Sequence, residues 1–329
     1  MRGYSKSISV FAAAVAAVLF FSLTTAFAAV QNIKGVEFTD GVVVYGKVVK
    51  MTADEIQIDT GDGALVTRKF TDVARLIKDD DRPEVKRQRH FFTVGTEVSY
   101  IKYKEPDVMQ EDGVMVGLVG SYAYRNQVML KAEGKYAYGQ VEYDGRTMGG
   151  TPLSISNIPN YALEGRGLVG YDFVVGIATI TPYVGLGYRW LQDNPQRKYP
   201  GGYQRESNYF YSPLGVDTVF DLGKGWFAAA NLEYDAFIWG KQKSRFSDID
   251  PGYNDLENRQ HNGFGIRGGV SFGFKGARAG FVVEPYVRYW KIEESDVAWL
   301  TYYGSFTGDG FVEPKNKSTE VGCRVAVTF

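Results

Sequence analysis

The sequence predicts an all-β protein: an antiparallel transmembrane β-barrel of about ten strands, preceded by a small N-terminal β-barrel-like domain. Three observations support this fold class. The chain ends in a strand that alternates apolar and polar residues, long segments with the same alternation recur before it, and the first residues resemble an export signal. The 37 Lys and Arg balance the 38 Asp and Glu, which argues against a nucleic-acid partner.

The N-terminus has the three regions of a secretory signal peptide, which we place at residues 1–28. Arg2 and Lys6 precede an apolar run, and Ala26 and Ala28 then supply the small residues of a cleavage site. An uncleaved anchor helix is the alternative, although the apolar run is short for one. No later run is apolar for long enough to form a spanning helix, so a membrane location requires strands.

Residues 29–78 predict a small β-module of the SH3 or Sm type. Short β-rich runs are broken at residues 40–41, 52–54 and 61–63 by Asp-Gly, Asp-containing and Gly-Asp-Gly sequences, which are hairpin signals. Four or five short strands in such a segment suit a small barrel. Modules of this kind bind a peptide, a glycan or a partner domain, so we expect a periplasmic partner of unknown identity. Residues 79–90 are charged, contain proline and predict a linker.

Residues 91–329 predict the barrel. Their alternating segments are roughly 12–16 residues long, enough to cross a bilayer at a tilt. We expect strands near 91–103, 113–125, 127–142, 160–173, 177–191, 208–221, 225–238, 262–274, 279–291 and 318–329. Long polar loops are expected near 104–112, 143–159, 192–207, 239–261 and 292–317. Short turns alternate with these loops, as in outer-membrane barrels, and an even strand count puts the N-terminal module in the periplasm.

The last strand carries an expected assembly signal. Val325, Val327 and Phe329 lie on one face, because side chains alternate along a strand, and Arg324 lies on the other. A final strand that ends in Phe is similar to the signal by which outer-membrane barrels are recognised for insertion. We therefore expect the barrel assembly machinery to act on Val325, Val327 and Phe329. The single cysteine, Cys323, is expected on the lipid face.

The same alternation predicts a lumen filled by charges of both signs. Unpaired buried charge is costly, so these residues should pair and close a barrel of this size. We therefore do not expect a general diffusion pore, and a narrow channel is kept as an alternative. The network is expected to include Glu164, Arg166, Glu233, Asp235, Arg267, Glu284, Arg288, Glu320 and Arg324.

The passage that contains Trp239-Gly240 and, further on, Asp248 and Asp250 resembles a loop of the omptins, ten-stranded outer-membrane proteases with an extracellular active site. The resemblance implies an Asp–His pair on this loop that activates a water molecule, opposite two aspartates on another loop. Asp248 and Asp250 match the motif. Gly252 stands where the resemblance requires the histidine.

Two further residues complete the set of candidate catalytic residues begun by Asp248 and Asp250. They are Asp144, on the expected facing loop, and His261, which could turn inward. Because the set is incomplete, we predict a non-enzymatic role in surface binding, envelope scaffolding or anchoring. An omptin-like endopeptidase with a rearranged site is the alternative. We expect no cofactor and no metal, since a calcium loop at Asp248, Asp250 and Asp255 would lack the regular ligand spacing.

Basic residues cluster near the expected extracellular ends of the strands. Phosphates of lipopolysaccharide lie at that depth and pair with Lys and Arg, although such residues also serve merely to solvate loops. We expect the chain in the outer membrane, surrounded by its lipid. The possible lipopolysaccharide contacts are Lys102, Lys104, Lys241, Lys243 and Arg245.

Overall fold

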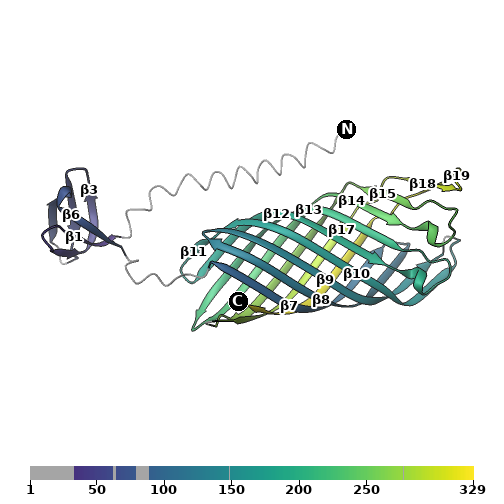
Figure 1. Cartoon of the computed structure of the whole chain (residues 1–329), viewed down its shortest axis with the longest axis horizontal. Helices are drawn as coiled ribbons and strands as arrows, with labels where there is room; N and C mark the ends of the chain where they lie inside the picture. The colour runs from purple at the N-terminus through teal and green to yellow at the C-terminus, as the bar shows by residue number, and fades with distance from the viewer. Residues whose placement is uncertain (1–32, 62–63, 79–88, 148, 277) are drawn as a thin grey trace. The chain divides into compact units, whose positions relative to one another are not determined.

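The chain divides into two compact units, Met1–Arg87 and Gln88–Phe329, and the described part of each is built mainly from β-strands (Figure 1). No helix among the described residues is long and apolar enough to cross a membrane. The expected signal peptide and most of the expected linker lie outside the residues that the computed structural model describes, which are 33–61, 64–78, 89–147, 149–276 and 278–329.

The N-terminal unit contains two three-stranded antiparallel sheets in its described part. Their strand orders are β2-β1-β6 and β3-β4-β5. The elements are β1 (Ile33–Phe38), β2 (Val43–Tyr45), β3 (Lys47–Met51), β4 (Glu55–Asp59), β5 (Leu65–Lys69), the 3-10 helix η2 (Phe70–Asp72) and β6 (Val73–Lys78).

Gly46 connects the two sheets, because it lies between β2 of one and β3 of the other. A Cβ at this position would overlap the carbonyl oxygen of Asp59, so the close approach of the strands requires glycine. This break was not among the predicted turns, and it raises the strand count above the four or five expected. The sheets share one buried core, and assignment of the unit to the SH3 or Sm class stays a prediction. The core consists of Ile33, Val36, Phe38, Val48, Ile56 and Ile58.

The second unit is a closed antiparallel β-barrel of ten long strands within its described residues (Figure 1). The order is β10-β9-β8-β7-β20-β17-β16-β14-β13-β12, and β12 pairs with β10 to close the ring. The bounds are β7 (His90–Glu105), β8 (Met109–Asn126), β9 (Val128–Arg146), β10 (Pro152–Tyr171), β12 (Ala178–Asp193), β13 (Arg205–Gly223), β14 (Trp226–Ser244), β16 (Gly263–Phe274), β17 (Gly280–Ile292) and β20 (Asn316–Thr328).

Closure leaves the barrel without an open edge. The first and last barrel strands, β7 and β20, pair in register from Thr93 to Lys104. At their ends, the Phe329 amide donates to the Phe92 carbonyl at 2.8 Å, and the Phe92 amide donates back at 3.1 Å. Each barrel strand therefore has a partner on both sides, which is the condition for strands to cross a bilayer.

Two predicted loops are wrong, because strands continue through them. The expected loop at 104–112 is reduced to residues 106–108, and the expected loop at 143–159 is reduced to residues 147–151. In these segments Glu111 still pairs with Tyr143 across β8 and β9. The outward face of a strand no longer meets lipid once it leaves the membrane, so the alternation that marks a lipid-facing strand in the sequence fades while backbone pairing continues.

One end of the barrel carries tight connections, and we call it the short-turn end. Lys224 and Gly225 have φ of 52° and 87°, which matches a two-residue hairpin turn. Gln127 also has positive φ, and the expected turn at 173–176 includes a short strand, β11 (Phe173–Val175), that pairs with β12. The chain enters the barrel at this end through β7 and finishes there at Phe329.

The opposite end, which we call the long-loop end, carries additional elements. These are the 3-10 helices η3 (Pro195–Arg197) and η4 (Phe246–Asp248), the strand β15 (Leu256–Gln260), and a hairpin of β18 (Ala298–Tyr302) and β19 (Ser305–Phe311). β15 extends the sheet by pairing with β14. A small buried core of Phe246, Leu256 and Leu300, with Phe311 packed against it, joins the hairpin to η4 and β15.

Candidate functional site: the barrel lumen and its long-loop end

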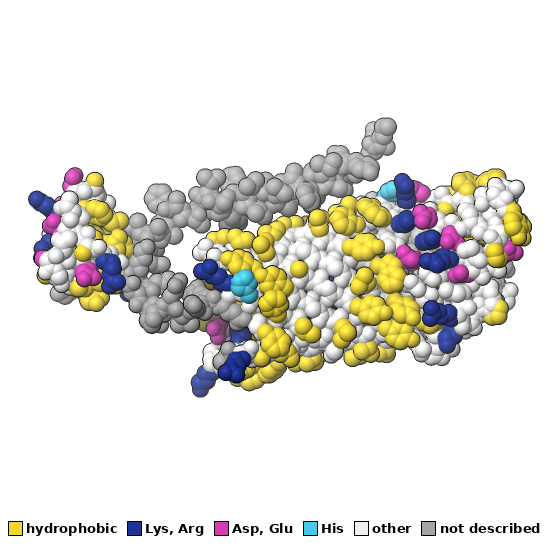
Figure 2. Space-filling model, viewed as in Figure 1, with side chains coloured by type: hydrophobic (Ala, Val, Ile, Leu, Met, Phe, Trp, Pro, Cys, Tyr) yellow, Lys and Arg dark blue, Asp and Glu magenta, His cyan; other side chains and the backbone are white. Residues whose placement is uncertain are grey.

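A belt of exposed apolar side chains surrounds the barrel. On β7, Phe92, Val94, Val98 and Tyr100 are between 46% and 63% exposed, and Lys102 follows at the next outward position. Figure 2 shows this apolar belt in yellow, with charged side chains gathered beyond it. A belt of this kind matches the lipid-facing surface of a membrane barrel. Other members are Val114, Val116, Leu118, Leu130, Leu163, Val169, Leu186, Leu232, Tyr234, Val270, Val287, Val321 and Val325.

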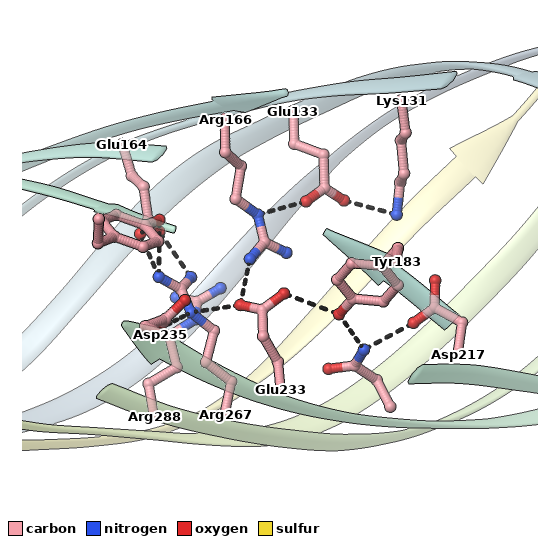
Figure 3. Close-up of polar contacts among 12 residues, drawn as sticks. Lys131, Glu133, Glu164, Arg166, Tyr183, Asp217, Glu233, Asp235, Arg267 and Arg288 are labelled. Carbon is pink, nitrogen blue, oxygen red and sulfur yellow. Dashed lines mark hydrogen bonds and ion pairs between the residues drawn. The ribbon is translucent and has the colours of Figure 1, made fainter. Parts of the chain in front are cut away.

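Inside the belt, Arg267 of β16 joins three acidic side chains. It contacts Glu164 of β10 at 2.9 Å and Asp235 of β14 at 2.7 Å, and it lies 3.0 Å from Glu233. Arg166 of β10 extends this cluster, because it lies 2.5 Å from both Glu133 and Glu233 (Figure 3). All of these side chains are largely buried, so each charge is balanced by contacts with opposite charge rather than by water.

A second lumen cluster lies where β7, β9, β17 and β20 face one another. Glu97 and Glu320 share the Lys135 ammonium group, at 2.6 Å each, and also share Arg288, at 3.3 and 3.1 Å. Arg324 lies 3.3 Å from Glu97 and 3.5 Å from Glu284. The sequence named Glu284, Arg288, Glu320 and Arg324 as a group, but it did not single out Glu97 and Lys135 as their shared partners.

The two clusters leave little free space between the strands. The lumen contains cavities of about 20 and 50 Å³, lined in part by Glu164 and Arg288. Such volumes hold a few water molecules at most. The lumen is therefore a packed polar core, and the ion pairs that cross it hold opposite sides of the barrel wall together.

A third charged group lies at the long-loop end, beyond the apolar belt, and we call it the rim cluster. Arg205, the first residue of β13, lies 3.0 Å from Glu105, 3.6 Å from Asp193 and 3.9 Å from Glu313. Glu111 lies in the same group, and its Oε1 has no hydrogen-bond partner among the described residues. The four acidic residues are between 3% and 9% exposed around a single guanidinium. Sequence reasoning missed this cluster, since its members come from five separate segments.

The candidate catalytic residues are not brought together. Asp248 accepts the backbone amide of the distant residue Gln204 at 2.9 Å. Asp250 accepts the Gly252 amide at 2.8 Å, as aspartates in turns do. Asp144 accepts the Ser154 hydroxyl on the exposed surface of β9. His261 lies 2.7 Å from Asp296, and both side chains are more than half exposed. Among these four candidates, no pair is in contact.

The expected lipopolysaccharide contacts form two separate groups. Lys241 and Lys243 pair with Glu257 and Asp255 on the hairpin of β14 and β15, at 3.2 and 3.3 Å. Arg245 follows them at the start of η4. Lys102 and Lys104 face outward on β7, where Lys104 lies opposite Lys317 of β20. Like charges in opposite positions are unfavourable without a counter-ion, so this second group is the better anion site.

Exposed aromatic side chains cover the tip of the β18–β19 hairpin. Trp299, Tyr303 and Phe306 are 54%, 77% and 65% exposed, and the rings of Trp299 and Phe306 lie 5.4 Å apart. Tyr303 has φ of 48°, and Gly304 follows with φ of 79°. A bulky side chain at positive φ is unusual and costs conformational energy. The sequence signal was the Trp299–Phe306 run of aromatic residues, which sequence reasoning assigned to a polar loop.

The residues expected to guide assembly lie on the last strand as follows. Val325 and Val327 are exposed in the apolar belt, and Phe329 is exposed at the short-turn end. Cys323 is exposed on the same outer face.

The fold has a counterpart among solved structures. The chain is similar to the outer membrane protease OmpT from Escherichia coli, with a TM-score of 0.54 and 9% identity, over 74% of this chain and 97% of that one. The fold is that of a ten-stranded outer-membrane barrel. Identity at this level establishes the shared fold alone, so the protease activity of that protein is not transferred with it.

A family model and two further solved structures also show similarity to this chain. A model of the autotransporter β-domain matches residues 107–198. Neisserial surface protein A matches with a TM-score of 0.29 and 15% identity, over 72% of this chain and 97% of that one. The transport unit of the autotransporter AIDA-I from Escherichia coli matches with a TM-score of 0.38 and 10% identity, over 77% of this chain and 93% of that one. No curated protein sequence matches. The autotransporter β-domain match and the apolar belt indicate an outer-membrane protein.

Proposed function

We propose that this chain is a non-enzymatic surface-binding protein of the outer membrane. A closed, ion-paired barrel would anchor it in the bilayer and present the aromatic β18–β19 hairpin to the outside. The observation that carries the proposal is the exposure of Trp299, Tyr303 and Phe306 at the end of the barrel opposite the start of β7 and Phe329. We expect insertion to depend on the barrel assembly machinery, through the last strand.

The proposed orientation follows from connectivity. An even number of strands returns the chain to the end at which it entered, so the N-terminal unit is attached at the short-turn end. Outer-membrane barrels keep short turns in the periplasm and longer loops outside. The hairpin would then be extracellular, and the N-terminal unit would be periplasmic.

The strain at Tyr303 supports a binding role for the hairpin. A residue such as Asn would occupy this turn position at lower cost. Tyr303 gains little burial in return, since it is 77% exposed, with its ring 4.7 Å from that of Tyr302 between centroids and beside Gly252. Strain of this kind is kept where the surrounding structure enforces it, and it is frequent at binding sites.

The chemistry of the tip favours a neutral, hydroxyl-rich ligand such as an uncharged glycan. Flat rings offer stacking surface for the apolar face of a sugar, and nearby carboxylates accept hydrogen bonds from hydroxyl groups. Asp309 is exposed on β19, and Asp250 lies 3.4 Å from the Tyr302 hydroxyl. These acidic groups disfavour an anionic lipid surface.

The test is binding of the detergent-solubilised full-length protein to immobilised neutral oligosaccharides. Combined replacement of Trp299, Tyr303 and Phe306 by Ala should weaken binding at least about tenfold, because exposed aromatic anchors dominate such contacts. Tyr45→Ala is the matched control, since Tyr45 is also exposed but lies in the N-terminal unit. Two results would contradict the proposal. One is an equal loss of oligosaccharide binding in the triple variant and in Tyr45→Ala. The other is a parent protein that binds only protein or only anionic lipid.

A second role is favoured by one feature of the N-terminal unit. Tyr45 and Val43 are 66% and 40% exposed on its outer surface, and the Tyr45 ring lies over Gly35. An exposed aromatic and aliphatic pair on a small β-unit suits a partner surface. The unit would then link the barrel to a periplasmic partner, as a scaffold or anchor. To test this role, a photoreactive group is placed at position 45 in cells, and the proteins that become cross-linked to it are identified.

Lipopolysaccharide is the proposed lipid partner, and Lys102, Lys104 and Lys317 are its proposed contacts. The narrow channel and the endopeptidase have less support. Lumen cavities of about 20 and 50 Å³ argue against a channel, and the separation of Asp144, Asp250 and His261 argues against a protease.

A further inference from the structure

The rim cluster cannot hold all of its charges at once. Glu105, Glu111, Asp193 and Glu313 surround Arg205, so four ionised carboxylates would face one cation. Glu111 Oε1 and Asp193 Oδ2 are buried without hydrogen-bond partners in the described part of the chain. Unneutralised buried charge is costly, and protons are the simplest means of removing it.

The Tyr103 hydroxyl shows where one of these protons is needed. It lies 3.0 Å from Glu105 Oε1 and 3.2 Å from Glu313 Oε1. A hydroxyl group has one hydrogen and can donate it to one of these oxygens. The other carboxyl group can form a hydrogen bond with the Tyr103 hydroxyl only if it carries a proton of its own, which it then donates to the tyrosine oxygen. Glu105 has the closer contact with Arg205, so Glu313 is the carboxyl group suited to carry the proton.

Glu313 also connects the cluster to the hairpin. It lies between β19 and β20, two residues beyond Phe311 at the end of the hairpin. Its backbone amide donates to the Ser295 hydroxyl at 2.8 Å, and the Ser295 amide donates to its carbonyl at 3.1 Å. The two chain segments that lead into and out of the hairpin are therefore joined at the residue whose side chain enters the rim cluster.

We propose that the rim cluster is a proton-binding site that holds the β18–β19 hairpin on the barrel rim through protonated Glu313. The site is independent of what the hairpin binds. When Glu313 loses its proton, it becomes a second buried anion beside Glu105. The hairpin base then separates from the rim so that this charge reaches water.

Burial supports this assignment. It raises the pKa of Glu313 to about 8 and the pKa of Asp193 to about 6, against the opposing effect of Arg205. Burial also raises the pKa of Glu111, and Asp193 raises it further. The titratable and charged groups that face Glu313 from the neighbouring elements are Tyr103 and Glu105 of β7, Glu111 of β8, Asp193 of β12, Tyr203 before β13, and Arg205 and Tyr209 of β13. Tyr143 of β9 faces Glu105, Glu111 and Arg205 of the same cluster.

The direction of the pH effect follows from linkage. Glu313 has a raised pKa in the closed form, near 8, and an ordinary value of 4.5 once exposed to water. The closed form therefore binds one more proton between these values, and its stability falls as pH rises through this window. For Glu313 alone, the equilibrium constant for opening should increase about tenfold per pH unit and level off above pH 8, roughly three-thousandfold in total.

The experiment is hydrogen–deuterium exchange of the full-length protein in detergent from pH 5 to 9, corrected for the intrinsic exchange rate. In the parent, protection of peptides that cover residues 295–313 should fall with the slope given above, while protection of the belt strands stays constant. Glu313→Gln should remove the slope, because a neutral amide imitates the protonated acid. Glu294→Gln, exposed in the same connection, is the matched control and should keep the slope.

Three results would overturn the proposal. They are parent protection that does not change with pH, a Glu313→Gln variant that is already open at pH 6, or restoration of protection at pH 9 by millimolar Ca²⁺, which would identify a metal site. If Glu313→Gln fails to form the barrel, Tyr103→Phe replaces it. That variant removes the bridging hydroxyl and should reduce hairpin protection at pH 6 without altering the belt.

Discussion

Arg267 of β16 donates a hydrogen bond of 2.9 Å to Glu164 of β10, although β12, β13 and β14 separate the two strands around the barrel. The contact therefore crosses the lumen. Because Arg267 also contacts Glu233 and Asp235 of β14, one side chain of β16 connects three acidic side chains on two other strands. The lumen acts as a polar core whose charges hold opposite walls at a fixed distance.

Replacing Arg267 should destabilise the barrel strongly. Arg267→Met would leave Glu164, Glu233 and Asp235 buried with too few cations, and breaking a buried network in this way costs about 3–5 kcal/mol. The measurement is the temperature at which the folded band disappears in heat-modifiability electrophoresis. Lys241→Met is the control, since the exposed Lys241–Glu257 pair should contribute less than about 1 kcal/mol. Equal effects of the two variants would refute a structural role for the network.

The parent protein should conduct no ions across a planar bilayer. The ion pairs of Lys135 and Arg288 with Glu97 and Glu320 occupy the lumen, and the adjoining cavities, of about 20 and 50 Å³, hold a few water molecules at most. Purified protein should give no steady current steps at either polarity. Large, long-lived open channels from the unmodified protein would show that the network does not close the barrel.

Epitope tags should distinguish the two ends of the barrel. A tag after Gly149 or Pro251, both at the long-loop end, should bind antibody on intact cells, whereas a tag at Gly223 should require a permeabilised outer membrane. Tags in exposed turns should leave the barrel fold intact. If antibody binds the Gly223 tag on intact cells and does not bind the Pro251 tag, the orientation is the reverse of the one proposed.

The parent protein should not cleave basic peptides. His261 is paired with Asp296 and has no contact with Asp248 or Asp250, so no imidazole is in place to activate water. Gly252→His should also be inactive. A Cβ at this position would lie 2.5 Å from the Tyr302 ring, which displaces the new side chain or the hairpin. Cleavage by the parent that His261→Ala abolishes would show that a displaced histidine does act as the base.

The sequence by itself determined which face of each barrel strand meets lipid. Val325 and Glu320 fall on opposite faces because side-chain direction in a strand depends only on residue parity, which is a local property. The same parity placed Glu164 and Arg267 in the lumen. It also established that charges of both signs would meet there, and the ten-stranded closed barrel follows from the repeated pattern.

The tertiary structure alone decided which charges touch and where the strands end. The Arg267–Glu164 pair depends on strand stagger and barrel diameter, which set the distances across the lumen and leave no trace in local periodicity. Glu105 and Glu111 join Asp193, Arg205 and Glu313 for the same reason, since each comes from a different segment. Beyond the membrane the outward face of a strand meets water, so the polar sequence at 104–112 resembled a loop although backbone pairing continues through most of it.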